Sequence, residues 1–325
     1  MGQRPRPNPR VPEPMVKSSH RSVFGYTVES DIPFNFLRSG EGEQVLRVDA
    51  ASNTELQHEG PPVFQWTFKD RSTEVSAQLY RAGAEFHFWT SDTGWYRVDP
   101  AAGRITIPDN GDEARRELRL WGVPSMLCFV ERGEIPLHAS AVEIEGGAIL
   151  FAAPGQFGKT TLALAFHRAG HRVLTEDLSC CRLWPTPVLI PGPASLRVRP
   201  DMFDGHAPEG TSVISIKPDR AFLALDSERR GTCVPVPIRG VVFLRKSEKE
   251  IPLEQVEAAR ALPDLWALSF RIRGHAGLAR CFSALSGMAS ATTIWNLYRP
   301  LRMDVLSEVI ALIVDLSSKQ AGPRR

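Results

Sequence analysis

The sequence predicts an α/β protein in which a smaller, mostly-β N-terminal domain precedes a P-loop domain. The first observation is a loop of small residues that ends in Gly158-Lys159-Thr160 and lies between an apolar run and a helix-forming run. The second is a series of short apolar segments over 23–107, separated at close intervals by Gly, Asn, Asp and Pro. Strand, loop and helix in that order are the context of a phosphate-binding loop, and short segments between turn residues are typical of β-structure.

Composition and charge limit the classes of partner. The chain has 325 residues, of which 42% are hydrophobic and 23% charged, and its net charge is +2. These values are ordinary for a soluble globular protein and give no reason to expect a nucleic-acid partner. No apolar run approaches the roughly 18–20 residues that span a bilayer, and the N-terminus lacks the apolar segment of a secretory signal. We therefore expect a cytoplasmic protein with no membrane partner.

The cysteines indicate neither a disulfide framework nor a zinc site. Their number is odd, and two of them are adjacent, so that pair cannot bracket a metal as a C-x-x-C motif does. We expect reduced, buried thiols at Cys128, Cys180, Cys181, Cys233 and Cys281.

The chain divides into four predicted segments. Residues 1–22 form a disordered, basic, proline-rich tail, and 23–110 form the mostly-β N-terminal domain. Residues 111–133 form a linking helix that Pro124 kinks or splits, and 134–320 form the P-loop domain. The strands expected in the N-terminal domain are Phe24–Val28, Val45–Val48, Val63–Phe68, Val75–Tyr80, Glu85–Trp89, Trp95–Val98 and Ile105–Ile107.

The P-loop domain is expected to alternate strands and helices, and beyond Leu253 to be helical except for one strand. The expected strands are Leu137–Ile144, Ala148–Ala153, Val173–Leu174, Val188–Gly192, Ser195–Arg199, Val241–Leu244 and Thr293–Tyr298. The expected helices are Thr160–Arg168, Leu262–Phe270, His275–Leu285 and Val305–Leu316.

The loop supplies the chemistry of a nucleotide-binding site. Backbone N–H groups of such a loop point inward at a helix N-terminus, where they bind phosphate. Lys159 is expected to reach the β- and γ-phosphates of ATP, and the Thr160 hydroxyl to hold Mg²⁺. An ordinary strand-to-helix turn is the alternative, but it does not explain a Lys-Thr pair directly inside the helix. The expected nucleotide-binding residues are Pro154, Gly155, Gln156, Phe157, Gly158, Lys159, Thr160 and Thr161.

A hairpin is expected to bring a histidine to this loop. The strand that contains His138 is followed by a tight turn at Glu145-Gly146-Gly147 and by the strand that enters the P-loop. This register places the partner of His138 between Ala153 and Gly155, at the mouth of the loop. The alternative is a histidine with a purely structural role at a strand start.

Two adjacent carboxylates, Glu176 and Asp177, follow the next short strand. Ligands of open α/β sheets bind at the carboxyl ends of strands, so one acid is expected to hold Mg²⁺ and the other to accept the proton of an attacking hydroxyl. We assign Thr160 and Asp177 to the metal, while which acid is the base stays open. Arg197 and Arg199 share one face of a later strand, and Arg197 is expected to neutralise phosphoryl charge, unless that face is merely solvated.

These segments together resemble the bacterial HPr kinase/phosphorylase family. The matching residues are Leu137-His138-Ala-Ser-Ala-Val, the Gly-Gly turn, the P-loop, Ala169-Gly170-His171 and Leu174-Thr-Glu-Asp177. The likeness is closest to its diverged HPr kinase-like branch, which includes kinases of lasso-peptide and related peptide biosynthetic clusters. A looser likeness extends to Asp99–Thr106 and to Trp295–Pro300.

The resemblance implies a PEP-carboxykinase-like P-loop domain with ATP and Mg²⁺ as cofactors. It implies that Lys159 and Thr160 bind phosphate and metal, that Glu176 and Asp177 are the family's acidic pair, and that His138 is its active-site histidine. Arg197 aligns with an arginine common in the branch. Two positions depart from the family pattern, because Ala153 replaces a glycine and Glu176 replaces an aspartate. The Arg-Gly-Leu-Gly signature of true HPr kinases is absent.

We therefore expect an ATP-dependent kinase that phosphorylates a serine-type hydroxyl on a peptide or small protein. The catalytic residues are expected to be Glu176, Asp177, His138 and Arg197. A small-molecule kinase, a nucleotide-binding regulatory protein without transfer activity and a simple NTPase are the alternatives. Because family members often form oligomers, the resemblance also leaves a homo-oligomer open.

Overall fold

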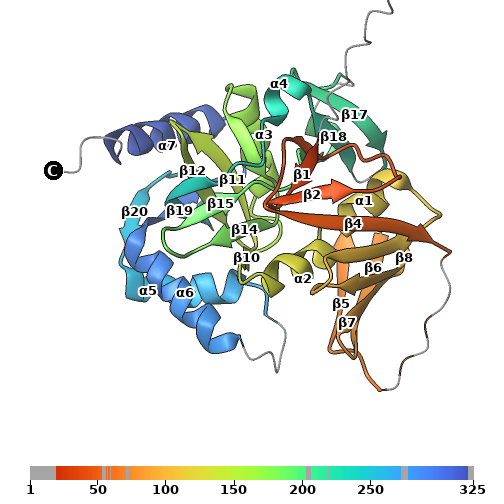
Figure 1. Cartoon of the computed structure of the whole chain (residues 1–325). Helices are drawn as coiled ribbons and strands as arrows, with labels where there is room; N and C mark the ends of the chain where they lie inside the picture. The colour runs from red at the N-terminus through yellow and green to blue at the C-terminus, as the bar shows by residue number, and fades with distance from the viewer. Residues whose placement is uncertain are drawn as a thin grey trace, which may run out of the picture.

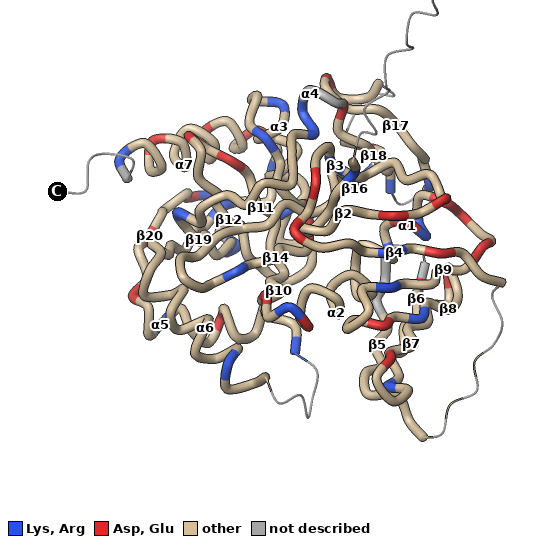
Figure 2. The backbone as a smooth tube through the Cα atoms, in the orientation of Figure 1, with Lys and Arg blue, Asp and Glu red and all other residues tan. Residues whose placement is uncertain are grey.

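The protein has a mixed α/β fold, seen in a computed structural model that describes residues 20–320 except 53–55, 57, 59, 71–72, 203–205, 219 and 272–276. A β-rich N-terminal region lies beside a second region in which helices cover a central sheet (Figure 1). Most of the predicted basic tail, residues 1–19, falls outside the described residues. Basic and acidic residues are interspersed over both regions (Figure 2).

The N-terminal region is a single nine-stranded sheet. In spatial order its strands are β3 (Arg38–Ser39), β1 (Arg21–Val23), β2 (Tyr26–Glu29), β4 (Gln44–Ala51), β9 (Arg104–Pro108), β8 (Gly94–Asp99), β7 (Glu85–Thr90), β6 (Thr73–Ala82) and β5 (Phe64–Asp70). The predicted strand Phe24–Val28 is confirmed over Tyr26–Val28, which lie in β2, but it begins too early. Phe24 and Gly25 form the two-residue turn between β1 and β2, with φ values of 50° and 75°. Two central residues with positive φ are typical of a tight hairpin turn.

Two helices connect the sheets. They are α1 (Glu113–Leu120), which Asp112 caps by accepting a 2.9 Å hydrogen bond from the Arg115 amide, and α2 (Val123–Glu131). The predicted split at Pro124 is confirmed, since Gly122 precedes α2 and Pro124 lies in its first turn, where a missing N–H costs nothing. Leu120, Trp121 and Phe129 join one core with the N-terminal sheet.

The central sheet runs in the order β10 (Ile135–Leu137), β14 (Ser179–Arg182), β15 (Val188–Ile190), β19 (Val236–Lys246), β12 (Gly147–Ala152), β11 (Ala139–Ile144) and β13 (Arg172–Thr175). Strand β21 (Thr293–Arg299) also pairs with β19, and β20 (Leu253–Val256) pairs with β21. The expectation of helix from Leu253 onward is therefore wrong for β20. Glu254 and Gln255 favour helix locally, but pairing with β21 decides the conformation.

A third sheet of β16 (Ser195–Val198), β18 (Ala221–Leu225) and β17 (Thr211–Ile216) lies beside α3 (Lys159–Arg168). The turns around it include η1 (Pro200–Met202) and α4 (Ser227–Arg230). Sequence analysis missed β14, β17 and β18, which are short strands without a clear alternation of apolar residues.

Alternating side chains on the central strands build two cores. Val142 and Phe151 pack with α3 and α7 (Leu306–Gln320), whereas Ala141 and Leu150 pack with α5 (Ala258–Leu268) and α6 (Leu278–Ala291). The predicted start of α6 at His275 lies outside the described residues. Within the described residues no helix is both long enough and apolar enough to cross a bilayer. All five cysteines are buried and none is in a disulfide.

The hairpin of β11 and β12 fixes the position of the predicted P-loop, here the loop 153–158 and the start of α3, relative to its neighbours. Ile144 pairs with Gly147 around a Glu145-Gly146 turn, and Ala139 pairs with Ala152. This confirms the predicted register, since the residue before Ala139 is then adjacent to Ala153. Strand β13 pairs with the other edge of β11, so its carboxyl end lies next to the same loop.

Arg38 ties the N-terminal sheet to the strand that carries the acidic pair. Its side chain is fully buried, and it donates hydrogen bonds to the carbonyl oxygens of Gly192 (2.7 Å), Val173 (2.9 Å) and Leu174 (2.8 Å), and to that of Arg230. Burial lowers the pKa of Arg38 to about 10, so the guanidinium stays charged at neutral pH. One side chain therefore satisfies several buried backbone acceptors of the second region.

Replacing Arg38 tests this role. We expect Arg38→Ala to lower the free energy of unfolding by about 3 kcal/mol or more, because several buried carbonyl acceptors lose their donor at about 1–3 kcal/mol each. Arg47→Ala is the matched control, since Arg47 is exposed and pairs with Glu29 at 3.1 Å, and such pairs contribute about 0–1 kcal/mol. Denaturant unfolding of both variants measures the difference. Equal effects would contradict the role.

Candidate functional site

The P-loop connects the end of β12 to the start of α3. Gln156 and Gly158 have φ values of 67° and 80°, which turn the chain sharply enough for Lys159 to open the helix. The Lys159 side chain is buried, and its Nζ donates to the carbonyl oxygens of Ala153 at 2.8 Å and Pro154 at 3.1 Å. Burial lowers the pKa of Lys159, although the nearby charges of Asp177 and Glu176 oppose the shift.

A buried arginine supports the loop from behind. The Nη2 of Arg299, at the end of β21, donates to the carbonyl oxygens of Phe157 and Gly158 at 3.2 Å each. A Cβ on Gly158 would lie 2.4 Å from this Nη2. Glycine is therefore required at 158 both for its positive φ and for the close approach of Arg299.

Glu176 lies directly against the P-loop. One of its carboxylate oxygens accepts a hydrogen bond from the Thr160 hydroxyl, and the other accepts from the Arg197 Nε at 2.8 Å. Its side chain is only 6% exposed. The carboxylate in contact with Thr160 is thus that of Glu176 and not that of Asp177, while the assignment of Thr160 and Asp177 to a metal stays a prediction. The cause is the turn after β13, which points the two adjacent side chains in different directions.

Asp177 faces the other side of Arg197. Its carboxylate contacts the Arg197 Nη2 at 2.8 Å and the His138 Nε2 at 3.1 Å. Burial acts to raise the pKa of Asp177, but the Arg197 charge and the His138 hydrogen bond outweigh it and hold the pKa well below its usual range. The side chains of His138 and Asp177 are 41% and 43% exposed, far more than the Glu176 side chain.

His138 is positioned by a break between two strands. The expected single strand Leu137–Ile144 is divided, because β10 pairs with β14 while β11 pairs with β12. The backbone N–H of His138 donates to the Leu268 carbonyl at 2.8 Å. The histidine is thus held at the junction, with its ring toward Asp177.

One cleft of about 900 Å³ brings most of the predicted site residues together. Its lining includes His138, Gly155, Gln156, Gly158, Lys159, Thr160, Thr161, Glu176, Asp177 and Arg197. Pro154 and Phe157, which were predicted to bind nucleotide, are not among the lining residues. Their carbonyl groups accept hydrogen bonds from Lys159 and Arg299, and the Phe157 side chain packs against the core. Arg199 also lines the cleft, next to Asp201 at 3.5 Å.

Sequence analysis missed several basic residues that line the cleft: Arg115, Arg119, Arg220, Arg299 and Arg302. One signal was available for Arg299, because it ends a central strand that runs parallel to its neighbour, and ligands bind beyond such strand ends. Arg115 and Arg119 come from α1, outside the P-loop region, and only the tertiary structure reveals them. The cleft lining has many more cationic than anionic side chains, which suits a polyphosphate ligand.

The residues at Thr160 fit a magnesium ion. Among the described residues there is no group of three His, Cys, Asp or Glu side chains arranged for a metal. Mg²⁺ does not require one, since it is usually held by one or two carboxylates together with water and substrate phosphates. A hydroxyl and a carboxylate in contact at the start of a P-loop helix match that donor set.

Comparison with known proteins gives little further information. No protein-family model matches the chain, and no curated protein does. Among solved structures it is similar to the Hpr(Ser) kinase/phosphatase from Coxiella burnetii, with a TM-score of 0.32 and 12% identity over 57% of this chain and 99% of that chain. A TM-score this low assigns no function to this chain.

The tight contact at Gly158 is testable with a matched pair of glycine variants. We expect Gly158→Ala to lower the free energy of unfolding by about 1–2 kcal/mol or more, because alanine disfavours positive φ and its Cβ displaces Arg299. Gly155→Ala should change stability little, since its Cβ would meet nothing within 4 Å. Denaturant unfolding compares the two, and equal destabilisation would contradict the proposed support by Arg299.

The low pKa of Asp177 predicts a pH dependence of stability. Its ionised form is favoured by folding, so its contribution is present above the unfolded-state pKa of about 3.9 and is lost as the pH falls below it. We expect the difference in free energy of unfolding between wild type and Asp177→Asn to be larger at about pH 5 than at about pH 3, where the Asp177 carboxylate is increasingly protonated. A difference that does not change with pH would argue against the Arg197 and His138 contacts.

Proposed function

We propose that this chain is an ATP- and Mg²⁺-dependent kinase that phosphorylates a serine-type hydroxyl on a peptide or small protein. The observation that carries the proposal is that the two carboxylates paired with Arg197 have different second partners. One carboxylate, Glu176, contacts the P-loop threonine, while the other, Asp177, faces the open cleft with His138. We also propose the HPr kinase-like, PEP-carboxykinase-like architecture for the P-loop domain.

The nucleotide would lie along the P-loop. The amides at the start of α3 and the positive end of its dipole favour phosphate oxygens. Lys159 would leave its carbonyl partners and reach the phosphates, a move that its flexible stem permits. Arg199, Arg220 and Arg302 line the same cleft and supply further positive charge for a triphosphate.

Thr160 and Glu176 would hold Mg²⁺, with Asp177 close by. When bound, the ion neutralises charge on the phosphates and fixes their orientation. This arrangement modifies the expectation from sequence, since Glu176 replaces Asp177 as the principal protein ligand. It also leaves Asp177 available to the acceptor.

Asp177 would act as the base toward the acceptor hydroxyl. The hydroxyl oxygen attacks the γ-phosphorus, the new O–P bond forms as the bond to the ADP oxygen breaks, and the hydroxyl proton passes to Asp177. His138 would hold the Asp177 carboxylate in position. If the γ-phosphoryl group draws Arg197 away from Asp177, the carboxylate becomes more basic at the moment when the proton must be accepted, and Arg197 stabilises the phosphoryl charge.

Transfer assays with three variants test the kinase. Purified full-length chain is incubated with Mg-ATP and a degenerate library of serine-containing peptides, and mass spectrometry measures the gain of one phosphoryl group. We expect Lys159→Ala to weaken ATP binding about 10- to 150-fold through lost charge-assisted hydrogen bonds. Asp177→Asn should slow transfer about 10²- to 10⁴-fold, the range of general-base catalysis.

Lys319→Ala is the matched control for Lys159→Ala, since Lys319 lies on α7 and pairs with Asp315 at 2.6 Å. It should leave binding and transfer unchanged. ATP binding that is insensitive to Lys159→Ala would contradict the P-loop assignment. If ATP binds through Lys159 but no peptide hydroxyl gains a phosphoryl group, the chain is a nucleotide-binding regulator or a small-molecule kinase instead.

A further inference from the structure

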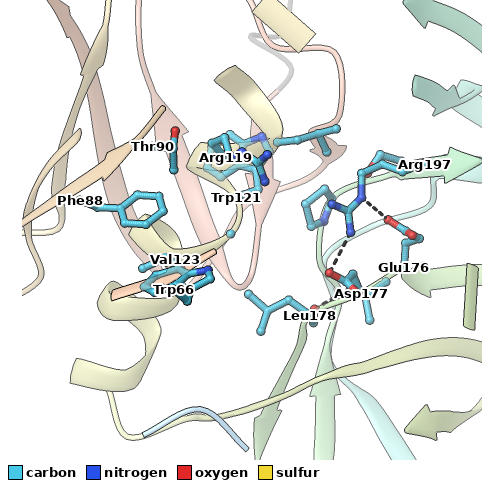
Figure 3. A pocket seen from close by; sticks show the side chains of 15 residues that line it. Trp66, Phe88, Thr90, Arg119, Trp121, Val123, Glu176, Asp177, Leu178 and Arg197 are labelled. Atoms are coloured by element: carbon cyan, nitrogen blue, oxygen red, sulfur yellow. Dashed lines mark hydrogen bonds and ion pairs between the residues drawn. The ribbon is translucent and has the colours of Figure 1, made fainter. Parts of the chain in front are cut away.

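A second, smaller pocket opens beside the acidic pair on the side of the N-terminal sheet. Its volume is about 170 Å³. In Figure 3, Trp66, Phe88 and Trp121 lie on one side of it, and Asp177 and Arg197 on the other. It therefore lies between the two regions of the fold.

The wall away from the acids is apolar. Trp66 on β5 and Phe88 on β7 stack with ring centroids 5.8 Å apart and an interplanar angle of 19°. Trp121 and Val123 complete this wall, and Leu178, which follows Asp177 in the chain, adds apolar surface on the side of the acids. Close-packed interiors leave few voids larger than a water molecule, so a pocket of this size between packed aromatics calls for an explanation beyond packing.

The pocket and the large cleft meet at the same residues. Leu118, Arg119, Glu176, Asp177 and Arg197 line both. The shared rim is held in place on the α1 side, because Asp92 contacts Arg119 at 2.8 Å and Arg115 at 3.4 Å. A group that enters the pocket is thus adjacent to Asp177, on the side away from the P-loop.

We propose that this pocket, lined by Trp66, Phe88, Trp121, Val123 and Leu178, binds an apolar side chain of about phenyl size that neighbours the phosphorylated hydroxyl in the acceptor. The inference rests on the proposed kinase function and gives its acceptor a chemical class: a peptide with a bulky apolar residue beside the serine. The size is suitable, because an engineered cavity of about 150 Å³ in another protein holds benzene. Because Asp177 lines both the pocket and the cleft, the apolar group is expected on a residue next to the one that carries the hydroxyl.

The nine-stranded sheet thereby gains a specific role. Trp66 and Phe88 come from strands near one end of that sheet, while Asp177 follows β13 of the central sheet. The acceptor would be recognised by one sheet and phosphorylated by groups on the other. Specificity of this kind requires only that a small apolar pocket bind a larger side chain more tightly than a smaller one. Each additional methylene that is buried there adds to the binding free energy.

Binding of two defined probes tests the pocket without requiring catalysis. The probes are N-acetyl-seryl-phenylalanine amide and N-acetyl-seryl-alanine amide. The protein is labelled with 5-fluorotryptophan, and its seven tryptophans are observed by fluorine NMR, with Trp66→Phe and Trp121→Phe used for assignment. We expect the phenylalanine probe to shift the Trp66 and Trp121 resonances and to bind about 10- to 100-fold more tightly than the alanine probe. Trp184, which is 83% exposed, should not shift.

Introducing a charge into the apolar wall tests whether that wall causes the preference for the phenylalanine probe. Val123→Asp places a carboxylate in the pocket at the first turn of α2, where helices tolerate acidic residues, and it should abolish the preference between the probes. Val234→Asp, at a position that is 64% exposed, should keep it. In the transfer assay, a positional serine-peptide library should favour Phe, Leu or Met beside the serine with wild type and lose this preference with Val123→Asp.

The outcomes separate the two proposals. Failure of the phenylalanine probe to shift Trp66 and Trp121, or library phosphorylation without apolar preference, overturns the pocket assignment even if the chain is a kinase. Probe binding at these tryptophans with no phosphorylation of any peptide supports the pocket and overturns the peptide-kinase function.

Discussion

The site depends on one guanidinium that lies between two adjacent carboxylates. Glu176 and Asp177 carry like charges on consecutive residues, and Arg197 contacts both at 2.8 Å. Without that cation the like charges of the two acids would repel each other. The turn after β13 points Glu176 toward Thr160 and Asp177 toward His138, and the contacts with Arg197 hold both carboxylates in place. The proposed roles of the two acids at the metal and at the acceptor depend on this arrangement.

Two other arginines, both buried, hold the backbone segments that surround the site. Arg38 crosses from the first sheet and holds the carbonyl groups of β13 and its surroundings, which fixes the strand that presents the acids. Arg299 holds the carbonyl groups of the P-loop. Both side chains donate to neutral backbone oxygens and not to carboxylates. They set the position of loop and strand, leaving the cleft-facing cations for phosphate.

Local sequence patterns could predict the parts of the site that lie close together along the chain. The P-loop, the acidic pair and the hairpin register around Glu145-Gly146 follow from short-range rules of turn chemistry and strand periodicity. Such rules say nothing about Arg38, Arg299 or Arg119, because their partners are far away in the sequence. The pairing of Thr160 with Glu176 also escaped prediction, since it depends on side-chain directions after β13. Strand β20 was mistaken for helix because its pairing with β21 outweighs local propensity.

Calorimetry of ATP binding in the presence and absence of Mg²⁺ distinguishes the roles of Glu176 and Asp177, with wild type, Glu176→Gln and Asp177→Asn compared side by side. We expect metal-dependent binding in wild type, loss of the metal dependence in Glu176→Gln, and affinity close to wild type in Asp177→Asn. That pattern would place the metal with Thr160 and Glu176 and leave Asp177 to the acceptor. Absence of metal-dependent ATP binding in wild type, or an equal loss in both variants, would contradict the division of roles around Arg197.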